Sequence, residues 1–217
     1  MSMISLLLQN SSGVMSVGLA SGKKLLFDSV SDIDLAGSRN VELYVKAALR
    51  NSNKKVPDLD CIFVDIGPGG LGATRTTAAF ANALGFARKI PVIGINAFEL
   101  IGAYVENLEQ KPVVCIRPAA RPNYYMALYK GQTLTDFSFS DVDEVKSFIR
   151  KYQDIAAFAG KFSFTTSIDL PEESWPSAIA NTTSMASFLR VALWKHKLGI
   201  RTTQVFPITE TLVATTS

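Results

Sequence analysis

The sequence predicts an α/β fold with two similar lobes, each a mixed β-sheet flanked by helices. Short apolar runs alternate with amphipathic stretches along the chain, which is typical of α/β proteins. Three strands joined by turns begin at Met3, and three similar strands recur about 110 residues later, from Val113. The 217 residues are 47% hydrophobic and 19% charged. The charged share is below the ~25% of typical soluble domains, so we expect a folded chain with some apolar surface covered by another protein.

The first lobe is expected over residues 1–110, in the order β-β-β-α-β-α-β-α. Its first helix is predicted because apolar residues recur at helical spacing between Val41 and Leu49. A glycine-rich turn separates the fourth strand from the second helix, which extends to about Arg88. The predicted strands cover residues 3–8, 14–19, 24–30, 59–66 and 91–95, and the other predicted helices cover 35–50 and 97–108.

The second lobe is expected over residues 111–217 and repeats the first in shortened form. We predict strands over residues 113–116, 124–129, 133–139 and 155–159, and helices over 141–152 and 181–198. Asp141 is a plausible N-cap with Glu144 three residues on, and Gly199 ends the last helix. Two copies of a β-β-β-α-β unit are the layout of the actin, sugar-kinase and Hsp70 (ASKHA) superfamily.

Several classes of function are excluded by residue counts. The chain has 22 Lys and Arg against 19 Asp and Glu, and a net charge of +3 is too small to indicate a nucleic-acid groove by itself. The one histidine, His196, cannot build a His-rich metal site, and Cys61 and Cys115 lie in apolar runs typical of buried free thiols. We therefore expect no metal, no cofactor and no catalytic residue.

Membrane insertion is not expected. The most apolar stretch, residues 76–87, is shorter than the ~20 residues that span a bilayer. The apolar run 3–8 is too short for a signal peptide. We expect a cytoplasmic protein.

The glycine-rich turn is the one local motif that carries chemistry, because a turn between a strand and a helix can present backbone N–H groups to an anion. The motif contains G-x-G-x-x-G, but Asn96 stands where a dinucleotide fold needs an acidic residue. It also resembles a P-loop whose lysine is replaced by Ala73. A nucleotide-binding enzyme, either a small-molecule kinase or a dinucleotide-dependent enzyme, is thus the alternative function. Its loop residues would be Gly67, Pro68, Gly69, Gly70 and Gly72.

The helix after this turn is expected to bind a partner protein. Between Ala73 and Ala87 its only charge is Arg75, whereas a surface helix of a monomer normally has a polar face. Phe80, Leu84 and Ala87 form a stripe suited to the sheet. The stripe predicted to face a partner, together with residues from helix 35–50, consists of Leu43, Ala47, Arg75, Ala78, Ala79, Asn82 and Phe86.

These residues resemble the TsaB (YeaZ) family, the scaffold subunit of bacterial tRNA threonylcarbamoyladenosine modification. The family pattern G-P-G-S-F-T-G-L-R-I-G is matched at Gly67, Pro68, Gly69 and Arg75, within the similar segment 67–104. A second similar segment covers residues 115–130, CIRPAARPNYYMALYK. The chain departs from the family at three places: Gln9-Asn10-Ser11 replaces Asp-Thr-Ser, Arg117 stands where Asp is usual, and residues 70–73 replace Ser-Phe-Thr-Gly.

The resemblance implies a non-catalytic subunit that supports a TsaD-like transferase, together with a TsaE-like ATPase. It also implies a homodimer in isolation, and tRNA contact only indirectly, through the complex. The kinase alternative needs an acidic residue where Gln9 or Arg117 stands. A third possibility is direct tRNA binding, but the basic residues are scattered along the sequence, which is more typical of solvated surface. They are Lys54, Lys55, Arg88, Lys89, Lys195, Lys197 and Arg201.

Overall fold

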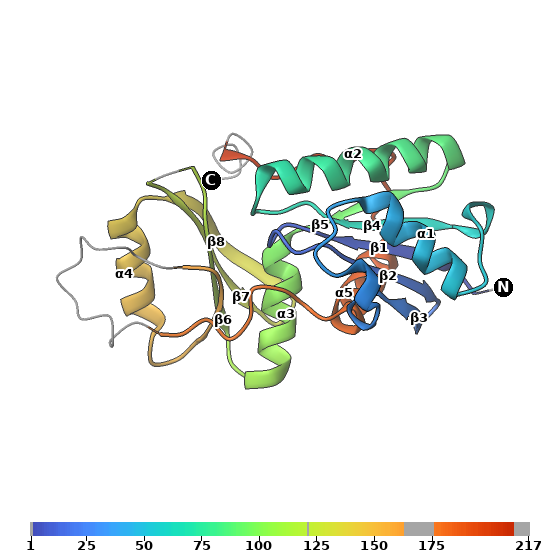
Figure 1. The fold of residues 1–217 in the computed structure, drawn as a ribbon. Helices are drawn as coiled ribbons and strands as arrows, with labels where there is room; N and C mark the ends of the chain where they lie inside the picture. The colour runs from blue at the N-terminus through green and yellow to red at the C-terminus, as the bar shows by residue number, and fades with distance from the viewer. Residues whose placement is uncertain (1, 121, 163–175, 211–217) are drawn as a thin grey trace. The chain divides into compact units, whose positions relative to one another are not determined.

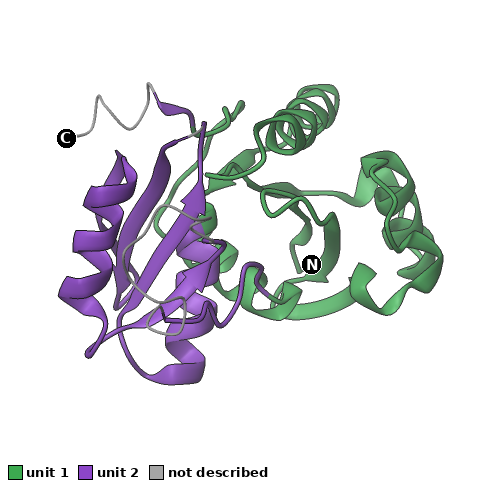
Figure 2. Cartoon of the chain, turned by 60° about the vertical axis from the view of Figure 1, so that its left-hand side comes forward, with its two compact units in different colours: residues 1–97, 184–208 green, residues 98–183, 209–217 purple. Residues whose placement is uncertain are grey.

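The computed structural model describes residues 2–120, 122–162 and 176–210 (Figure 1). The chain forms two compact units (Figure 2): unit 1 is Met1–Ala97 with Ser184–Ile208, and unit 2 is Phe98–Thr183 with Thr209–Ser217. The units differ from the predicted lobes, residues 1–110 and 111–217, in the assignment of two helices. The helix that follows residue 97 belongs to unit 2, and the last helix returns to unit 1.

Unit 1 contains a five-stranded mixed sheet in the order β3-β2-β1-β4-β5. The strands β1 and β2 pair antiparallel, as do β2 and β3, whereas β1, β4 and β5 are parallel. This is the predicted β-β-β-α-β-α-β order. The strands are β1 (Ile4–Gln9), β2 (Ser16–Ser21), β3 (Lys24–Asp28), β4 (Cys61–Asp65) and β5 (Val92–Ile95).

Helices cover both faces of this sheet, which is why β1 and β4 are buried along their whole length. The helices α1 (Val41–Asn51) and α2 (Leu71–Arg88) pack on one face, where Tyr44 and Ala81 join Leu6 and Ile62 in one apolar cluster. On the other face, α5 (Met185–Lys197) contacts β1, β2 and β3. Parallel strands that are buried on both faces, such as β1 and β4, need the near-continuous apolar runs found in this sequence.

Two helices begin later than predicted, and side-chain caps explain both differences. Helix 35–50 was predicted, but Ile33–Leu35 forms a separate short 3₁₀ turn. The α-helix starts at Val41 because Asn40 accepts hydrogen bonds from the backbone N–H groups of Glu42 and Leu43. Similarly, the last helix begins at Met185 rather than 181, after the N-cap Ser184.

Unit 2 contains a four-stranded mixed sheet in the order β8-β7-β6-β9. Its helix α4 (Val142–Tyr152) begins with the predicted cap: Asp141 and Glu144 form a capping box. The helix α3 (Ala97–Glu109) packs on β7, where a Cβ added at Gly102 would lie 2.5 Å from the Tyr129 ring. The strands are β6 (Val113–Pro118), β7 (Tyr124–Lys130), β8 (Thr133–Ser140) and β9 (Ala157–Gly160).

The fold class predicted from the sequence is therefore confirmed: each unit is a mixed sheet flanked by helices, and the second sheet is the shorter copy. Among the residues that the structure describes, no helix is long and apolar enough to cross a membrane.

Candidate functional site

The glycine-rich turn connects β4 to α2 at the end of the sheet where the parallel strands finish. Asp65, fully buried at the end of β4, links this turn to the end of β1. Its Oδ1 accepts a hydrogen bond from the Gly67 N–H (2.9 Å), and its Oδ2 accepts one from the Ser11 N–H (3.0 Å). Two backbone N–H donors thus replace the hydration that the carboxylate loses on burial. Asp65 was not among the predicted site residues; its signal in the sequence is a lone acidic residue at the end of the apolar run CIFVD.

The turn packs directly on the backbone that follows β1. The Gly70 N–H donates to the Ser11 carbonyl oxygen (2.9 Å), and a Cβ added at Gly69 would lie only 2.1 Å from the same oxygen. Gly67 has a φ of +89°, in the region that favours glycine. The N–H groups of Gly67 and Gly70 already have intramolecular acceptors. A phosphate at this turn would have to displace them.

The segment after β1 holds α2 in place. Asn10 donates from its Nδ2 to the Ala73 carbonyl oxygen (3.3 Å) and to the Thr77 Oγ1 (3.1 Å). Gln9 is 1% exposed. The residues that replace Asp-Thr-Ser of the TsaB family are therefore buried, neutral parts of the packing between β1 and α2.

Arg117 lies at the end of β6, the unit 2 counterpart of β1. It is 2% exposed and donates from its Nε to the Asn181 Oδ1 (3.1 Å) and from its Nη2 to the Asn181 carbonyl oxygen. This guanidinium takes a structural role within unit 2. The order of the strands predicted the position of Arg117, but its partner comes from a segment 64 residues away.

Both cysteines are buried free thiols, as predicted. Burial raises the pKa of Cys61 to about 12, an effect that the nearby positive charge of Arg201 opposes. Burial also raises the pKa of Cys115 well above its usual range. Neither thiol has the lowered pKa of a nucleophilic cysteine.

The inner face of α2 is wider than the predicted stripe, of which Phe80 and Leu84 are half-buried against the apolar cluster of the sheet. Its buried residues are Thr74, Thr77, Ala78, Ala81 and Gly85. The threonines tolerate burial because their hydroxyls donate to carbonyl oxygens one turn earlier in the same helix. Gly85 permits close approach of the sheet, since a Cβ there would lie 2.2 Å from a Val92 methyl.

Three of the predicted partner-binding residues, two on α2 and one on α1, do not lie freely on the surface. Ala78 is 2% exposed and lies in the core, as does Ala47 of α1 at 6%. Asn82 is half-buried and clamps the chain's own C-terminal segment: its Nδ2 donates to the Val205 carbonyl oxygen and its Oδ1 accepts from the Val205 N–H, both at 2.9 Å. Ala87, predicted to face the sheet, is exposed.

The other predicted residues do lie on the surface. Arg75 and Ala79 are exposed, Phe86 is 86% exposed, and Leu43 of α1 is 50% exposed. The structure adds Leu71, Ala83 and Ala87 to the same side of the helix. We call this set the outer α2 face; it consists of Leu71, Arg75, Ala79, Ala83, Phe86 and Ala87. Apart from Arg75 it is uncharged, and its small alanines would allow a second backbone to approach closely.

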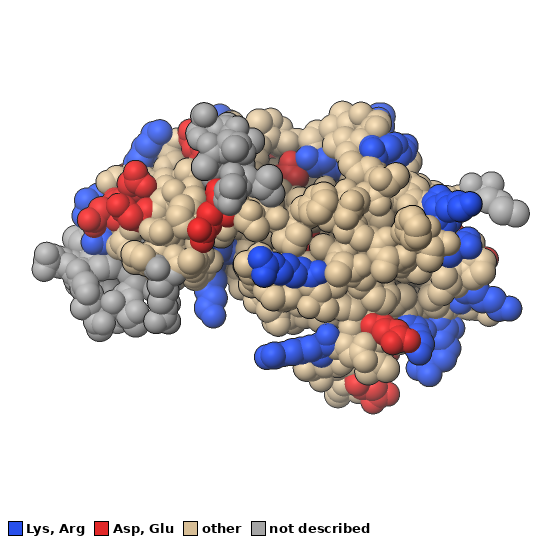
Figure 3. Space-filling view, turned by 90° about the horizontal axis from the view of Figure 1, so that it is seen from above, with Lys and Arg blue, Asp and Glu red and all other residues tan. Residues whose placement is uncertain are grey.

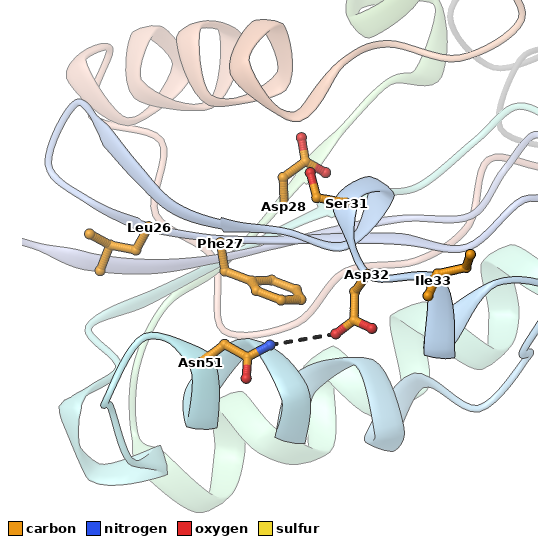
Figure 4. Close-up of a pocket in the computed structure, with 7 residues that line it drawn as sticks. All are labelled: Leu26, Phe27, Asp28, Ser31, Asp32, Ile33 and Asn51. Carbon is orange, nitrogen blue, oxygen red and sulfur yellow. Dashed lines mark hydrogen bonds between the residues drawn. The ribbon is translucent and has the colours of Figure 1, made fainter.

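A pocket of ≈ 480 Å³ lies in unit 1 beside the edge strand β3 (Figure 4). Phe27 and Asp32 line it, and the Asn51 Nδ2 donates across it to the Asp32 Oδ2 (3.5 Å). Its other lining residues are Leu26, Asp28, Ser31 and Ile33. Within residues 2–120, 122–162 and 176–210, no group of three or more His, Cys, Asp or Glu side chains is placed to hold a metal ion.

Comparisons with known proteins define the family to which this chain belongs. A family model described as "TsaD: tRNA N6-adenosine threonylcarbamoyltransferase" matches residues 36–193, and the chain belongs to this family. A curated tRNA N6-adenosine threonylcarbamoyltransferase from Clostridioides difficile (strain 630) is 36% identical over 75 residues, which are 34% of this chain and 22% of that protein. The matched part of the chain thus spans about a fifth of the length of that relative.

Among solved structures, the fold is that of YeaZ. The structure titled "YeaZ from Pseudomonas aeruginosa" matches with a TM-score of 0.65 at 14% identity, over 95% of this chain and 99% of that one. A P. aeruginosa protein described as uncharacterized, with similarity to peptidase YEAZ, matches with a TM-score of 0.66 at 15% identity and the same coverage. The predicted likeness to TsaB (YeaZ) is confirmed.

Proposed function

We propose that this chain is a non-catalytic scaffold subunit of the system that adds a threonylcarbamoyl group to the adenosine next to the tRNA anticodon. It would bind a TsaD-like transferase through the outer α2 face. The observation that carries this proposal is Phe86, an aromatic side chain 86% exposed on a helix whose outer face has a single charge. Exposed apolar surface of this kind marks protein interfaces, where aromatic anchors carry much of the binding energy.

The two kinds of comparison support a partner rather than the transferase itself. The likeness to YeaZ extends over 95% of this chain and 99% of that one, whereas the curated transferase is matched over 22% of its length. As the resemblance to TsaB implies, the chain would act in the cytoplasm with a TsaE-like ATPase, and it would form homodimers in isolation.

The polar groups at the strand ends support a non-catalytic role. Gln9 stands where kinases of the superfamily need an acidic residue. Asp65 is already bonded by two backbone N–H groups, and Arg117 is bonded to Asn181. The alternative of a nucleotide-binding enzyme at Gly67–Gly72 has less support because the N–H groups of Gly67 and Gly70 are engaged within the chain. Magnesium-dependent ATP turnover by the pure chain would favour it.

The proposal is tested by measuring threonylcarbamoyladenosine in tRNA incubated with the transferase and ATPase from the same genome, with and without this chain. We expect modification to require the chain. Phe86→Asp should reduce modification at limiting chain concentration by 10-fold or more, because it places a charge in a desolvated contact. Ile155→Asp, a matched change at an exposed isoleucine of unit 2, should have little effect. Modification that is independent of the chain would refute the proposal.

A further inference from the structure

Basic residues that are scattered in the sequence gather at one edge of unit 1. The strands β1, β4 and β5 are parallel, with Ser5 opposite Cys61 and Ile62 opposite Val92. The N-terminal ends of these strands therefore lie together, and this end of the sheet is the edge of unit 1 meant here. The β2–β3 hairpin turns at the same edge, because Ser21 pairs with Ile4. The β2–β3 hairpin and the segments that precede β4 and β5 bring cations to it.

Hydrogen bonds place the remaining segments at this edge. The Asp60 Oδ2 accepts from the Ile4 N–H (2.7 Å), which fixes the loop before β4 beside β1. Arg88 donates to the Pro57 carbonyl oxygen (2.9 Å), and the Val92 N–H donates to the Thr202 carbonyl oxygen (2.9 Å). We call the resulting surface the basic edge; its cations are Lys23, Lys24, Lys54, Lys55, Arg88, Lys89, Lys197 and Arg201.

Few negative charges oppose them. The carboxylates of these segments are Asp58 and Asp60, and each accepts a backbone N–H: Asp58 from Lys55 (2.8 Å) and Asp60 from Ile4. Asp28 lies at the other end of β3, opposite Gly18, and so faces away from this edge. In Figure 3, several Lys and Arg side chains lie at the right-hand end, where α2 finishes in Figure 1, and acidic side chains lie beside them only toward the lower right.

Helix ends account for only part of this cluster. Cations stabilise helix C-termini, which explains Arg88 and Lys89 at the end of α2 and Lys197 at the end of α5. Lys23 and Lys24 lie instead at a hairpin tip, and Lys55 lies in the loop before β4. Five adjacent strands at ~4.8 Å spacing extend over roughly 20 Å, enough to meet several phosphates of one nucleic-acid strand.

We propose that the basic edge binds the phosphate backbone of the tRNA substrate. This inference rests on the proposed function, which supplies the RNA. It replaces the expectation that tRNA is reached only indirectly, through the other subunits. Contacts of this kind neutralise phosphates without reading bases, so they position the tRNA for the transferase and are strongly dependent on salt.

The test measures binding of a fluorescent, unmodified tRNA that reads ANN codons to the full chain mixed with its transferase partner, over a range of salt concentrations. Lys23, Lys24, Lys55 and Lys197 are exposed, lie outside the outer α2 face, and are replaced together by Gln. We expect tRNA binding to weaken roughly 10–100-fold near 0.1 M salt, and the slope of log K against log salt to fall by about 2–3. A matched control neutralises four exposed lysines of unit 2: Lys111, Lys130, Lys151 and Lys161.

The control should bind tRNA within about twofold of the wild type. If both variants bind tRNA equally more weakly, the effect comes from net charge alone and the proposal is overturned. Unchanged tRNA binding by the variant of the basic edge would also overturn it. Lysine-dependent binding to anionic lipid vesicles without lysine-dependent tRNA binding would also overturn it. Light scattering separately reports pairing with the transferase. If the wild type does not pair, the proposed function fails, and the same lysine comparison on the chain alone still decides whether the edge binds RNA.

Discussion

At the scale of single residues, the turn between β4 and α2 depends on two close contacts that are invisible in the glycine pattern. Asp65 bonds the backbone of Ser11 and Gly67, and Gly69 lies against the Ser11 carbonyl oxygen. The glycine pattern left open a nucleotide-binding turn as the alternative function. In the structure, Gly69 permits close packing on the backbone of Ser11.

Gly69→Ala should therefore destabilise the protein by about 2–3 kcal/mol, because the new Cβ would lie 2.1 Å from a backbone oxygen that cannot move away cheaply. Gly72→Ala is the control, since a Cβ there meets nothing within 4 Å. Urea unfolding followed by circular dichroism measures both. Equal stability of the two variants would contradict the packing described for Gly69.

The buried thiols make the free energy of unfolding depend on pH in the alkaline range. Burial raises the pKa of Cys61 to about 12 from 9.0, and it also raises the pKa of Cys115. Above pH 9 the unfolded chain loses these protons while the folded chain keeps them. The free energy of unfolding therefore keeps its full value below pH 9. Above pH 9 it should decline by up to about 1.4 kcal/mol per pH unit for each thiol.

Urea unfolding at pH 8 and pH 10 tests this decline, with the Cys61→Ala and Cys115→Ala double variant as the control. Buried tyrosines such as Tyr129, with a pKa raised to about 12, act in the same direction, so the control should have a smaller decline rather than none. An identical decline in both proteins would show that the thiols titrate normally.

At the scale of elements, the strands and the starts of α3 and α4 could be predicted, but the starts of α1 and α5 and the whole inner face of α2 could not. Strand positions follow from apolar runs, whereas α1 begins where Asn40 provides a cap. The predicted stripe of α2 contained Phe80, Leu84 and Ala87 and did not include the threonines that also face the core. Thr74 and Thr77 satisfy their hydroxyls within the helix and face the core, which turns Ala78 inward and Phe86 outward.

This orientation predicts opposite results for two neighbouring alanines. Ala78→Glu buries an unpaired carboxylate in the core and should cost several kcal/mol of stability. Ala79→Glu, on the exposed side, should change stability by less than about 0.5 kcal/mol, yet it should weaken association with a second protein. Thermal melts and light scattering of both variants separate these effects. A stable Ala78→Glu variant would contradict the helix orientation.

At the scale of the whole molecule, the surface features belong to different parts of unit 1. The outer α2 face is uncharged apart from Arg75, and the basic edge collects cations from segments that are up to about 180 residues apart, from Lys23 to Arg201. The clustering of those cations could not be predicted from the sequence, because it depends on the parallel register of β1, β4 and β5, which brings their loops together. The repeat of two sheets, in contrast, could be predicted from the order of elements alone.

The proposed role of this chain is to pair with a TsaD-like transferase. It is tested most directly by size-exclusion chromatography with light scattering, on the chain alone and mixed with the transferase from the same genome. We expect a homodimer that is replaced by a heterodimer in the mixture, and loss of both species in Ala79→Glu. A monomer that remains unchanged when the transferase is added would contradict it.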